Sequence, residues 1–260
     1  MREQVRVTGI ILTVMPLGEN DRRVTILTKE RGKLTAFARG ARKPNHQLFG
    51  VTQPLVYGEF MVSEGRTVSY LNSGEGKDFF RTLREDLSCI YYGTYFAELA
   101  EYFTVEGMDE RNTLNLLFVT LKTMEKQAVP LELIRRIFEY RLLQYYGIGL
   151  SVFSCISCGK EEDFHYLFID QGGVVCEDCR QKKKEGRQGQ EAGYGGHFYP
   201  VRLTPALLYA LQYVTSAPLT RLYAFRLSDE VFAEFAFIVK HFMRLHVGHR
   251  FKSEQMLDML

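Results

Sequence analysis

The sequence predicts an α+β protein of more than one domain: a small five-stranded N-terminal barrel, followed by an all-helical domain into which a four-cysteine ribbon is inserted. Three observations predict it. Residues 4–72 form short β-branched segments separated by turn residues, apolar residues recur every three or four positions from Asp78 onward, and four of the five cysteines lie within residues 155–179. A length of 260 residues allows two or three such units.

The first 72 residues are expected to form five short strands. The segment 4–15 alternates and is rich in β-branched residues, 22–39 reads as strand, turn and strand around Glu30-Arg31-Gly32, and 54–63 and 67–72 supply two more strands. Five strands are too few for two packed sheets, so we expect a small closed barrel. An OB-fold is the leading architecture and an SH3-like barrel is the alternative.

Helices are expected from residue 78 onward. The apolar positions between Phe80 and Tyr102 lie on one helical face, residues 114–124 mark a second helix, and Pro130 suits the first turn of a third that ends near Tyr146. Helices resume at 204–214 and after Ser228, a good N-cap. The expected domains are the barrel at 1–77, the helical domain at 78–150 and 200–260, and the ribbon with a Gly- and Lys-rich loop at 151–199.

The four clustered cysteines predict a metal site. Cys155, Cys158, Cys176 and Cys179 form two Cys-x2-Cys pairs, a spacing that directs four thiolates at one tetrahedral ion. We expect structural zinc, with iron as the alternative, because a closed shell of four thiolates leaves no position for a substrate. His165 is expected to be an ordinary ribbon side chain and Cys89 a buried, inert thiol.

Basic charge is concentrated at the two ends of the chain. Residues 1–50 carry a net charge of +6, residues 151–179 carry −5, and residues 180–260 carry +5. The N-terminal basic residues surround the expected second and third strands and the loop RGARKPNHQ at 39–47. Such segregation is what phosphate binding requires, although a solvated charged loop is the competing interpretation. Phe37, Phe49, Tyr57 and Phe60 are expected either to stack on bases or to fill the barrel core.

No enzyme motif is present, and GEGKD at 74–78 lacks the spacing of a P-loop. We therefore expect a protein that is not an enzyme. The N-terminus does not read as a signal peptide and no segment reads as a membrane span, which favours a cytoplasmic protein without a membrane partner.

Several segments are distinctive: GIIL at 9–12, ILTKERGKLTAFARGARKP at 26–44, QPL at 53–55, the approach from GIGL to Cys155 at 147–155, the two cysteine pairs, and HVGHRFKS at 246–253. In these segments the sequence resembles the bacterial recombination-repair family RecO. The resemblance implies binding of single- and double-stranded DNA and annealing of complementary strands. It also implies cooperation with RecR in loading RecA onto DNA coated by single-strand-binding protein, and a nucleoid-associated location.

The resemblance also implies site residues. The expected DNA contacts are Lys29, Arg31, Lys33, Arg39, Arg42 and Lys43, with Arg22 and Arg23 as weaker candidates. For the acidic, apolar-ended tail of single-strand-binding protein, the candidates are Lys240, Phe242, Arg244 and Arg250. Two other functions stay open on the residues alone: an RNA-binding factor built from an OB-fold and a zinc ribbon, and a peptide-binding adaptor.

Overall fold

The computed structural model describes residues 3–65, 67–185, 200–257 and 259. The chain forms two compact units, one made of Met1–Phe138 with Arg250–Leu260 and the other of Glu139–His249. No helix in the described ranges is long and apolar enough to cross a membrane. The predicted division into three domains at residues 77, 150 and 199 stays a prediction.

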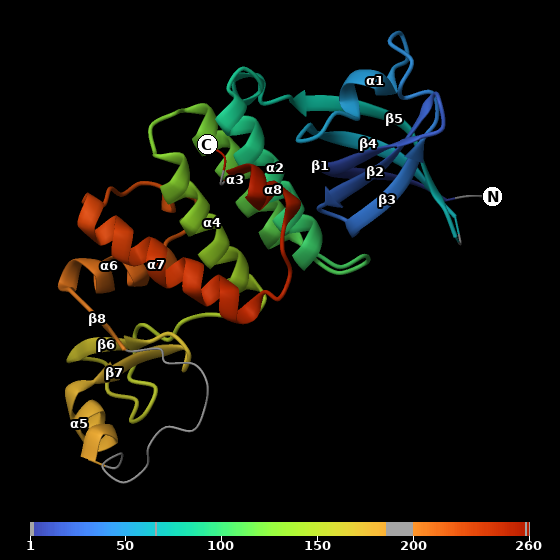
Figure 1. Cartoon of the computed structure of the whole chain (residues 1–260). Helices are drawn as coiled ribbons and strands as arrows, with labels where there is room; N and C mark the ends of the chain where they lie inside the picture. Colours follow the sequence, from blue (N-terminus) through green and yellow to red (C-terminus); the bar gives the residue numbers. More distant parts are fainter. Residues whose placement is uncertain (1–2, 66, 186–199, 258, 260) are drawn as a thin grey trace. The chain divides into compact units, whose positions relative to one another are not determined.

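Figure 1 shows the strands and helices in chain order. They are β1 (Glu3–Leu17), β2 (Asp21–Thr28), β3 (Gly32–Ala38), α1 (Leu48–Val51), β4 (Tyr57–Glu64), β5 (Ser69–Asp78), η1 (Arg81–Arg84), α2 (Leu87–Phe103), α3 (Arg111–Glu125), α4 (Leu131–Tyr145), β6 (Phe164–Phe168), β7 (Gly173–Cys176), α5 (Glu177–Glu185), β8 (Val201–Arg202), α6 (Pro205–Ser216), η2 (Leu219–Arg221), α7 (Asp229–His246) and α8 (Lys252–Leu257).

The first five strands close into a barrel in the order β1-β2-β3-β5-β4, and β4 pairs back onto β1. Every neighbouring pair is antiparallel except β3 with β5, which are parallel. The short helix α1 lies in the connection between β3 and β4. This strand order confirms the five-stranded barrel and matches the OB-fold arrangement, not the SH3-like one.

Two glycines, Gly9 and Gly58, allow strands of this barrel to approach each other closely. Gly9 of β1 pairs with Gly58 of β4, and Gly58 pairs with Gly76 of β5. A Cβ atom on Gly9 would lie 2.2 Å from the carbonyl oxygen of Leu27, and one on Gly58 would lie 2.2 Å from that of Glu75. Both neighbours are backbone atoms of adjacent strands, so no side chain can be accommodated without moving a strand.

Helix α2 is joined to the barrel through Glu101. The Glu101 carboxylate accepts hydrogen bonds from the Thr13 hydroxyl at 3.3 Å and from the Thr25 hydroxyl at 3.2 Å. The β2–β3 turn also contacts the loop after α2, because the Gly107 amide donates to the Arg31 carbonyl at 3.2 Å. These polar contacts fix one side of the barrel against the helices of the same unit.

The second unit contains the four-cysteine ribbon and helices α6 and α7. Its three-stranded sheet has the order β7-β6-β8. The strands β6 and β7 belong to the ribbon, whereas β8 lies where the sequence predicts the start of the helical region. Helix α5 extends to Glu185, where the sequence predicts the Gly- and Lys-rich loop of the segment 151–199, and residues 186–199 lie outside the described residues. Ser228 caps α7 as expected, since its side chain accepts from the Val231 amide.

Replacing Gly58 with alanine should destabilise the barrel by about 1–3 kcal/mol, because the new methyl group collides with backbone and not with a movable side chain. Hydrogen exchange of peptides from residues 3–78 measures this effect locally. The matched control is Gly50→Ala in α1, where an added Cβ meets nothing within 4 Å. Equal protection in both variants would contradict the close-approach argument.

Candidate nucleic-acid interface and metal centre

The eight cations predicted to contact nucleic acid divide between the two ends of the β2–β3 hairpin. In the ladder, Arg22 pairs with Ala38 at one end and Thr28 pairs with Gly32 at the other. These ends are roughly 20 Å apart at about 3.3 Å per residue. The first end carries Arg22, Arg23, Arg39, Arg42 and Lys43, and the second carries Lys29, Arg31 and Lys33. The eight cations therefore form two groups, one at each end of the hairpin.

Two of the three cations at the second end are engaged in internal contacts. Lys33 donates from Nζ to the Glu101 carbonyl at 2.8 Å, and Arg31 donates from Nε to the Glu64 carboxylate at 3.1 Å. Lys29 is exposed, and its side chain has no partner in the part of the chain that the structure describes. Lys33 thus fastens the barrel to α2, and Arg31 is partly neutralised.

Arg22 also has a structural role. Its Nη1 donates to the Phe49 carbonyl at 2.9 Å and to the Thr52 hydroxyl at 2.7 Å, and its guanidinium lies 5.2 Å from the centre of the Phe49 ring. Burial and, secondly, the charge of Arg42 lower the pKa of Arg22 from its ordinary value. Arg22 therefore ties β2 to α1 and is only partly exposed.

The basic loop after β3 is held in place by the turn between β1 and β2. The Gly40 amide donates to the Asp21 carboxylate at 2.8 Å, and the Arg42 amide donates to the Asn20 carbonyl at 2.9 Å. The Arg42 Nη1 donates to the Gly18 carbonyl at 2.7 Å. The ordered loop displays the exposed side chains of Arg39, Arg42 and Lys43 at one end of the barrel.

A row of side chains crosses four strands beside this loop. Met15, Arg23, Phe37 and Tyr70 are successive ladder partners on β1, β2, β3 and β5. The Phe37 and Tyr70 rings lie 6.1 Å apart, and the Arg39 guanidinium covers the Tyr70 ring at 4.7 Å. We call these four residues together with Arg39 the aromatic–cation row. Rings and cations in this arrangement suit stacked bases and their phosphates.

The other aromatic side chains predicted to stack on bases make contacts within the protein instead. Phe60 is 1% exposed in the barrel core, Tyr57 packs 4.7 Å from the Phe118 ring, and Phe49 lies beneath Arg22. Tyr70 was not among the predicted residues. The alternation of the strand contained the signal for it, because the next residue, Leu71, is buried in the core and Tyr70 therefore faces outward.

The four cysteines converge on one point in the second unit. Their sulfur atoms all lie within 4.8 Å of one another, and the Sγ atoms of Cys158 and Cys176 are 3.7 Å apart. A tetrahedral ion with bonds of about 2.3 Å to sulfur requires sulfur–sulfur distances of about 3.8 Å. Gly159, at φ 78°, closes the first knuckle by donating from its amide to the Cys155 carbonyl at 2.8 Å. The cluster therefore fits a four-coordinate ion.

The pKa values of these thiols reflect their hydrogen bonds to one another and to backbone amides. Burial alone would raise the pKa of Cys155, but backbone amides of Cys176, Ser157 and Cys158 that donate to its sulfur lower it to about 6. Hydrogen bonding with the neighbouring sulfurs of Cys158 and Cys176, before the smaller effect of burial, raises the pKa of Cys179 to about 12. Four adjacent thiolates repel one another, and a bound cation removes that repulsion.

His165 and Cys89 match their predicted roles. His165 is an exposed ribbon residue whose ring lies 2.9 Å from the Asp163 carboxylate. Cys89 is 2% exposed, and burial, followed by the charge of Asp86, raises its pKa to about 11. A thiol with that pKa is a poor nucleophile at neutral pH.

The residues predicted to hold a peptide tail do not all face solvent. Lys240 and Arg244 are exposed one turn apart on α7, but Phe242 is 1% exposed and packs against His246. Phe237 of this helix is 56% exposed, and its ring stacks on His241. Arg250 is exposed and belongs to the other compact unit.

Comparisons with known proteins assign the chain to a family. Residues 1–80 match the family model for the N-terminal part of recombination protein O, and residues 84–195 match the model for its C-terminal part. The chain is 36% identical over 176 residues to the DNA repair protein RecO of Alkaliphilus metalliredigens, which covers 67% of this chain and 72% of that protein.

Two further relatives match along nearly their whole length. The chain is 30% identical to the DNA repair protein RecO of Clostridium perfringens strain 13, over 97% of this chain and 96% of that protein. It is 27% identical to the DNA repair protein RecO of Bacillus subtilis strain 168, over 97% of this chain and 93% of that protein. The chain therefore belongs to the RecO family of DNA repair proteins.

Proposed function

We propose that this protein binds single-stranded DNA across the end of its OB barrel that carries the aromatic–cation row, and that it brings complementary strands together there. As a RecO family member it is a recombination mediator and not an enzyme. The observation that carries the proposal is the row itself, in which Phe37 and Tyr70 lie 6.1 Å apart beside Arg39. Bases stack on such rings, and the flanking cations bind phosphates without reading sequence.

Annealing needs no nucleotide hydrolysis in this scheme. Two single strands repel each other through their phosphates, and the cations of the row and of the basic loop reduce that repulsion. Base pairing then supplies the driving force. Duplex DNA can use the same cations, although its stacked bases are not available to Phe37 and Tyr70.

Family membership supports further partners. We propose that the protein cooperates with RecR in loading RecA onto DNA coated by single-strand-binding protein. For the acidic tail of single-strand-binding protein we propose the outer face of α7, where the exposed ring of Phe237 lies on the same helix as Lys240 and Arg244. An apolar residue of the tail would contact the ring and its carboxylates would pair with the two cations.

We propose that the ion held by the four cysteines is zinc, in a structural role. Sulfur donors in a closed tetrahedral set favour zinc, and such a set leaves no position for water or substrate. The second compact unit contains the cluster, whereas the aromatic–cation row lies in the first. The metal would stabilise the ribbon without contributing to DNA contacts.

Reversing Arg39, Arg42 and Lys43 to glutamate should weaken binding to single strands of every sequence. Loss of about three phosphate contacts should make the slope of log affinity against log salt less steep by about 2. Fluorescence anisotropy with labelled oligonucleotides between 50 and 300 mM salt, about the range over which counterion release is readily measured, provides the test. The matched control reverses Arg6, Arg111 and Lys126, three exposed cations outside the row. An unchanged slope in the first variant would contradict the proposal.

Removing either ring of the row should weaken single-strand binding more than duplex binding. Phe37→Ala and Tyr70→Ala should each cost about 1–3 kcal/mol with single strands, as one stacked base is lost, and much less with duplex. Tyr209→Ala, which removes a ring that is 63% exposed on α6, is the control. Equal losses for both forms of DNA would show that the rings do not stack on bases.

Zinc should be present at one ion per chain and should be lost from Cys176→Ser. Mass spectrometry of the metal measures occupancy, and hydrogen exchange of peptides from residues 151–179 should increase in the variant because the ribbon loses its cross-link. Cys89→Ala, at the buried cysteine outside the cluster, should retain the ion. Loss of single-strand binding in a metal-free protein with an intact barrel would overturn the structural role.

A further inference from the structure

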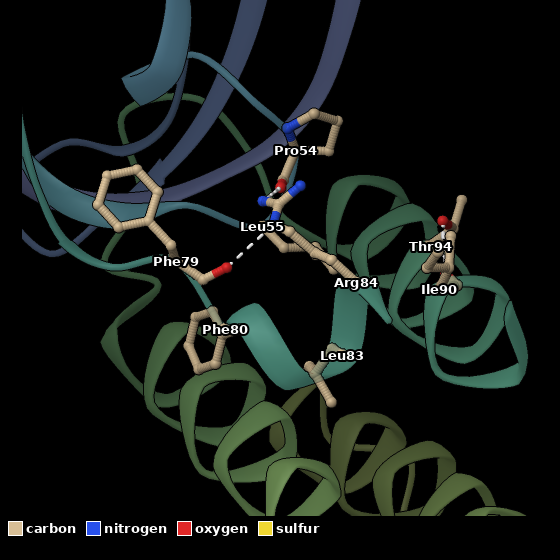
Figure 2. A pocket seen from close by; sticks show the side chains of 8 residues that line it. All are labelled: Pro54, Leu55, Phe79, Phe80, Leu83, Arg84, Ile90 and Thr94. Atoms are coloured by element: carbon tan, nitrogen blue, oxygen red, sulfur yellow. Dashed lines mark hydrogen bonds between the residues drawn. The ribbon is translucent and has the colours of Figure 1, made fainter. Parts of the chain in front are cut away.

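A cavity of about 340 Å³ lies in the first unit, beside the barrel, and nothing in the DNA-binding scheme uses it (Figure 2). It opens between the α1–β4 connection, the residues that follow β5, and helix α2. Its walls include the apolar side chains of Leu55, Phe80, Leu83 and Ile90, and its polar members are Arg84 and Thr94. This volume is within the range of small ligand pockets, and it holds one or two apolar side chains.

The backbone around the cavity is strained. Leu55 and Phe80 both have positive φ angles, 66° and 44°, and these are unusual for residues other than glycine. Hydrogen bonds hold both in place: the Leu55 amide donates to the Ile11 carbonyl at 2.8 Å, and the Phe80 amide donates to the Asp78 carboxylate at 3.0 Å. Strain of this kind persists where the surroundings enforce it, and it is concentrated at binding sites.

Helix α2 is shaped to receive one of these residues. A Cβ atom on Gly93 would lie 2.7 Å from the Leu55 Cδ1, so glycine at this position lets the Leu55 side chain pack against the helix. Ile90 and Leu87 lie three and six residues before Gly93 in the same helix, and they are 38% and 58% exposed. The cavity therefore continues into an apolar strip along α2.

Arg84 supplies a fixed cation at this cavity. Its Nε donates to the Phe79 carbonyl at 3.0 Å and its Nη2 donates to the Pro54 carbonyl at 2.7 Å, as the dashed lines in Figure 2 show. These bonds hold the guanidinium between the two strained segments. No described residue accepts a hydrogen bond from its Nη1. Arg84 is exposed as a residue, but partial burial lowers its pKa, so an anion beside it would favour its charged form.

The lining argues against a nucleobase as the occupant. The Thr94 hydroxyl already donates to the Ile90 carbonyl at 2.8 Å, so Arg84 is the remaining strong donor. Phe80 is 1% exposed and packs edge-on to Phe118 at 5.8 Å, so its ring face is not open for stacking. The polar edge of a base in this cavity would be left largely unpaired, which is costly.

We propose that this cavity is a docking site for a segment of a partner protein in which an aliphatic side chain lies next to a carboxylate. The aliphatic group fills the space between Leu55, Leu83 and Ile90. The carboxylate binds the free Nη1 edge of Arg84, and the neighbouring residues of the segment cover the strip at Leu87. Charge complementarity at Arg84 within an otherwise apolar lining is the basis for choosing this occupant.

The test is methyl NMR on the full chain labelled at isoleucine and leucine methyl groups. N-acetyl-L-leucine carries both required groups and should shift the methyl signals of Leu55, Leu83 and Ile90 at concentrations on the order of millimolar, the range expected for so small a ligand. N-acetyl-L-leucinamide, which lacks the carboxylate, should bind about tenfold more weakly. Equal binding of the two compounds, or no shift at these three residues, would overturn the proposal.

Variants distinguish a change in the cavity from a change in the overall fold. Arg84→Gln should weaken the binding of N-acetyl-L-leucine about tenfold and leave the binding of N-acetyl-L-leucinamide unchanged. Arg81→Gln, at an exposed residue of the same turn, should change the affinity for neither compound. Thr94→Phe fills the cavity from an exposed helix position and should abolish the shifts even if Arg84→Gln disturbs folding. Retained shifts in Thr94→Phe would overturn the proposal.

Two further outcomes would assign the cavity to another occupant and overturn the proposal. One is the movement of the same methyl signals by a short oligonucleotide. The other is self-association of the wild-type chain in sedimentation experiments that Thr94→Phe abolishes. Single-strand binding should be unchanged in Thr94→Phe, so failure of this proposal and failure of the DNA-binding proposal are distinguishable.

Discussion

The architecture depends on the absence of side chains at Gly9, which lies against β2, and at Gly58, which lies against β5. The backbones of adjacent strands occupy the space that a Cβ atom would need at both positions. This close approach allows five strands to close into a narrow barrel, and closure brings β3 alongside β5 as a parallel pair. Phe37 and Tyr70, which are 33 positions apart in the sequence, become neighbours only through that pairing. The proposed DNA surface is thus a product of barrel closure.

The basic residues of the barrel have two different tasks. Arg22 and Lys33 use their charge inside the protein, where carbonyl oxygens of α1 and α2 accept their hydrogen bonds. Arg39 and Lys43 remain at the surface. A charged side chain bound to carbonyl oxygens adds rigidity, and its removal would weaken the proposed DNA binding indirectly by loosening the barrel. Loss of binding on mutation of Arg22 is therefore no evidence of a phosphate contact.

The sequence was sufficient to predict the structure where residues close together in the chain determine it. The spacing of the two cysteine pairs predicted the sulfur cluster, because each pair needs one tight turn, and the alternating segments predicted all five barrel strands. It was insufficient where the residues that contact each other are far apart in the sequence. Nothing near Lys33 in the sequence indicates that Glu101 accepts its hydrogen bond, and the two-residue strand β8 forms only because β6 offers a free edge. The eight cations lie at opposite ends of the β2–β3 hairpin because the strands between them are seven to eight residues long.

The hydrogen bonds between the β1–β2 turn and the basic loop have a consequence for recognition. Asp21, Asn20 and Gly18 hold the loop in one shape before any ligand arrives. The conformational entropy of ordering that loop is therefore lost during folding and not at the moment of association. Insertions in the turn at residues 18–21 would loosen the loop and reduce the lifetime of bound complexes, although the turn itself need touch no ligand. The length of this turn therefore affects recognition, although its own residues need not bind the ligand.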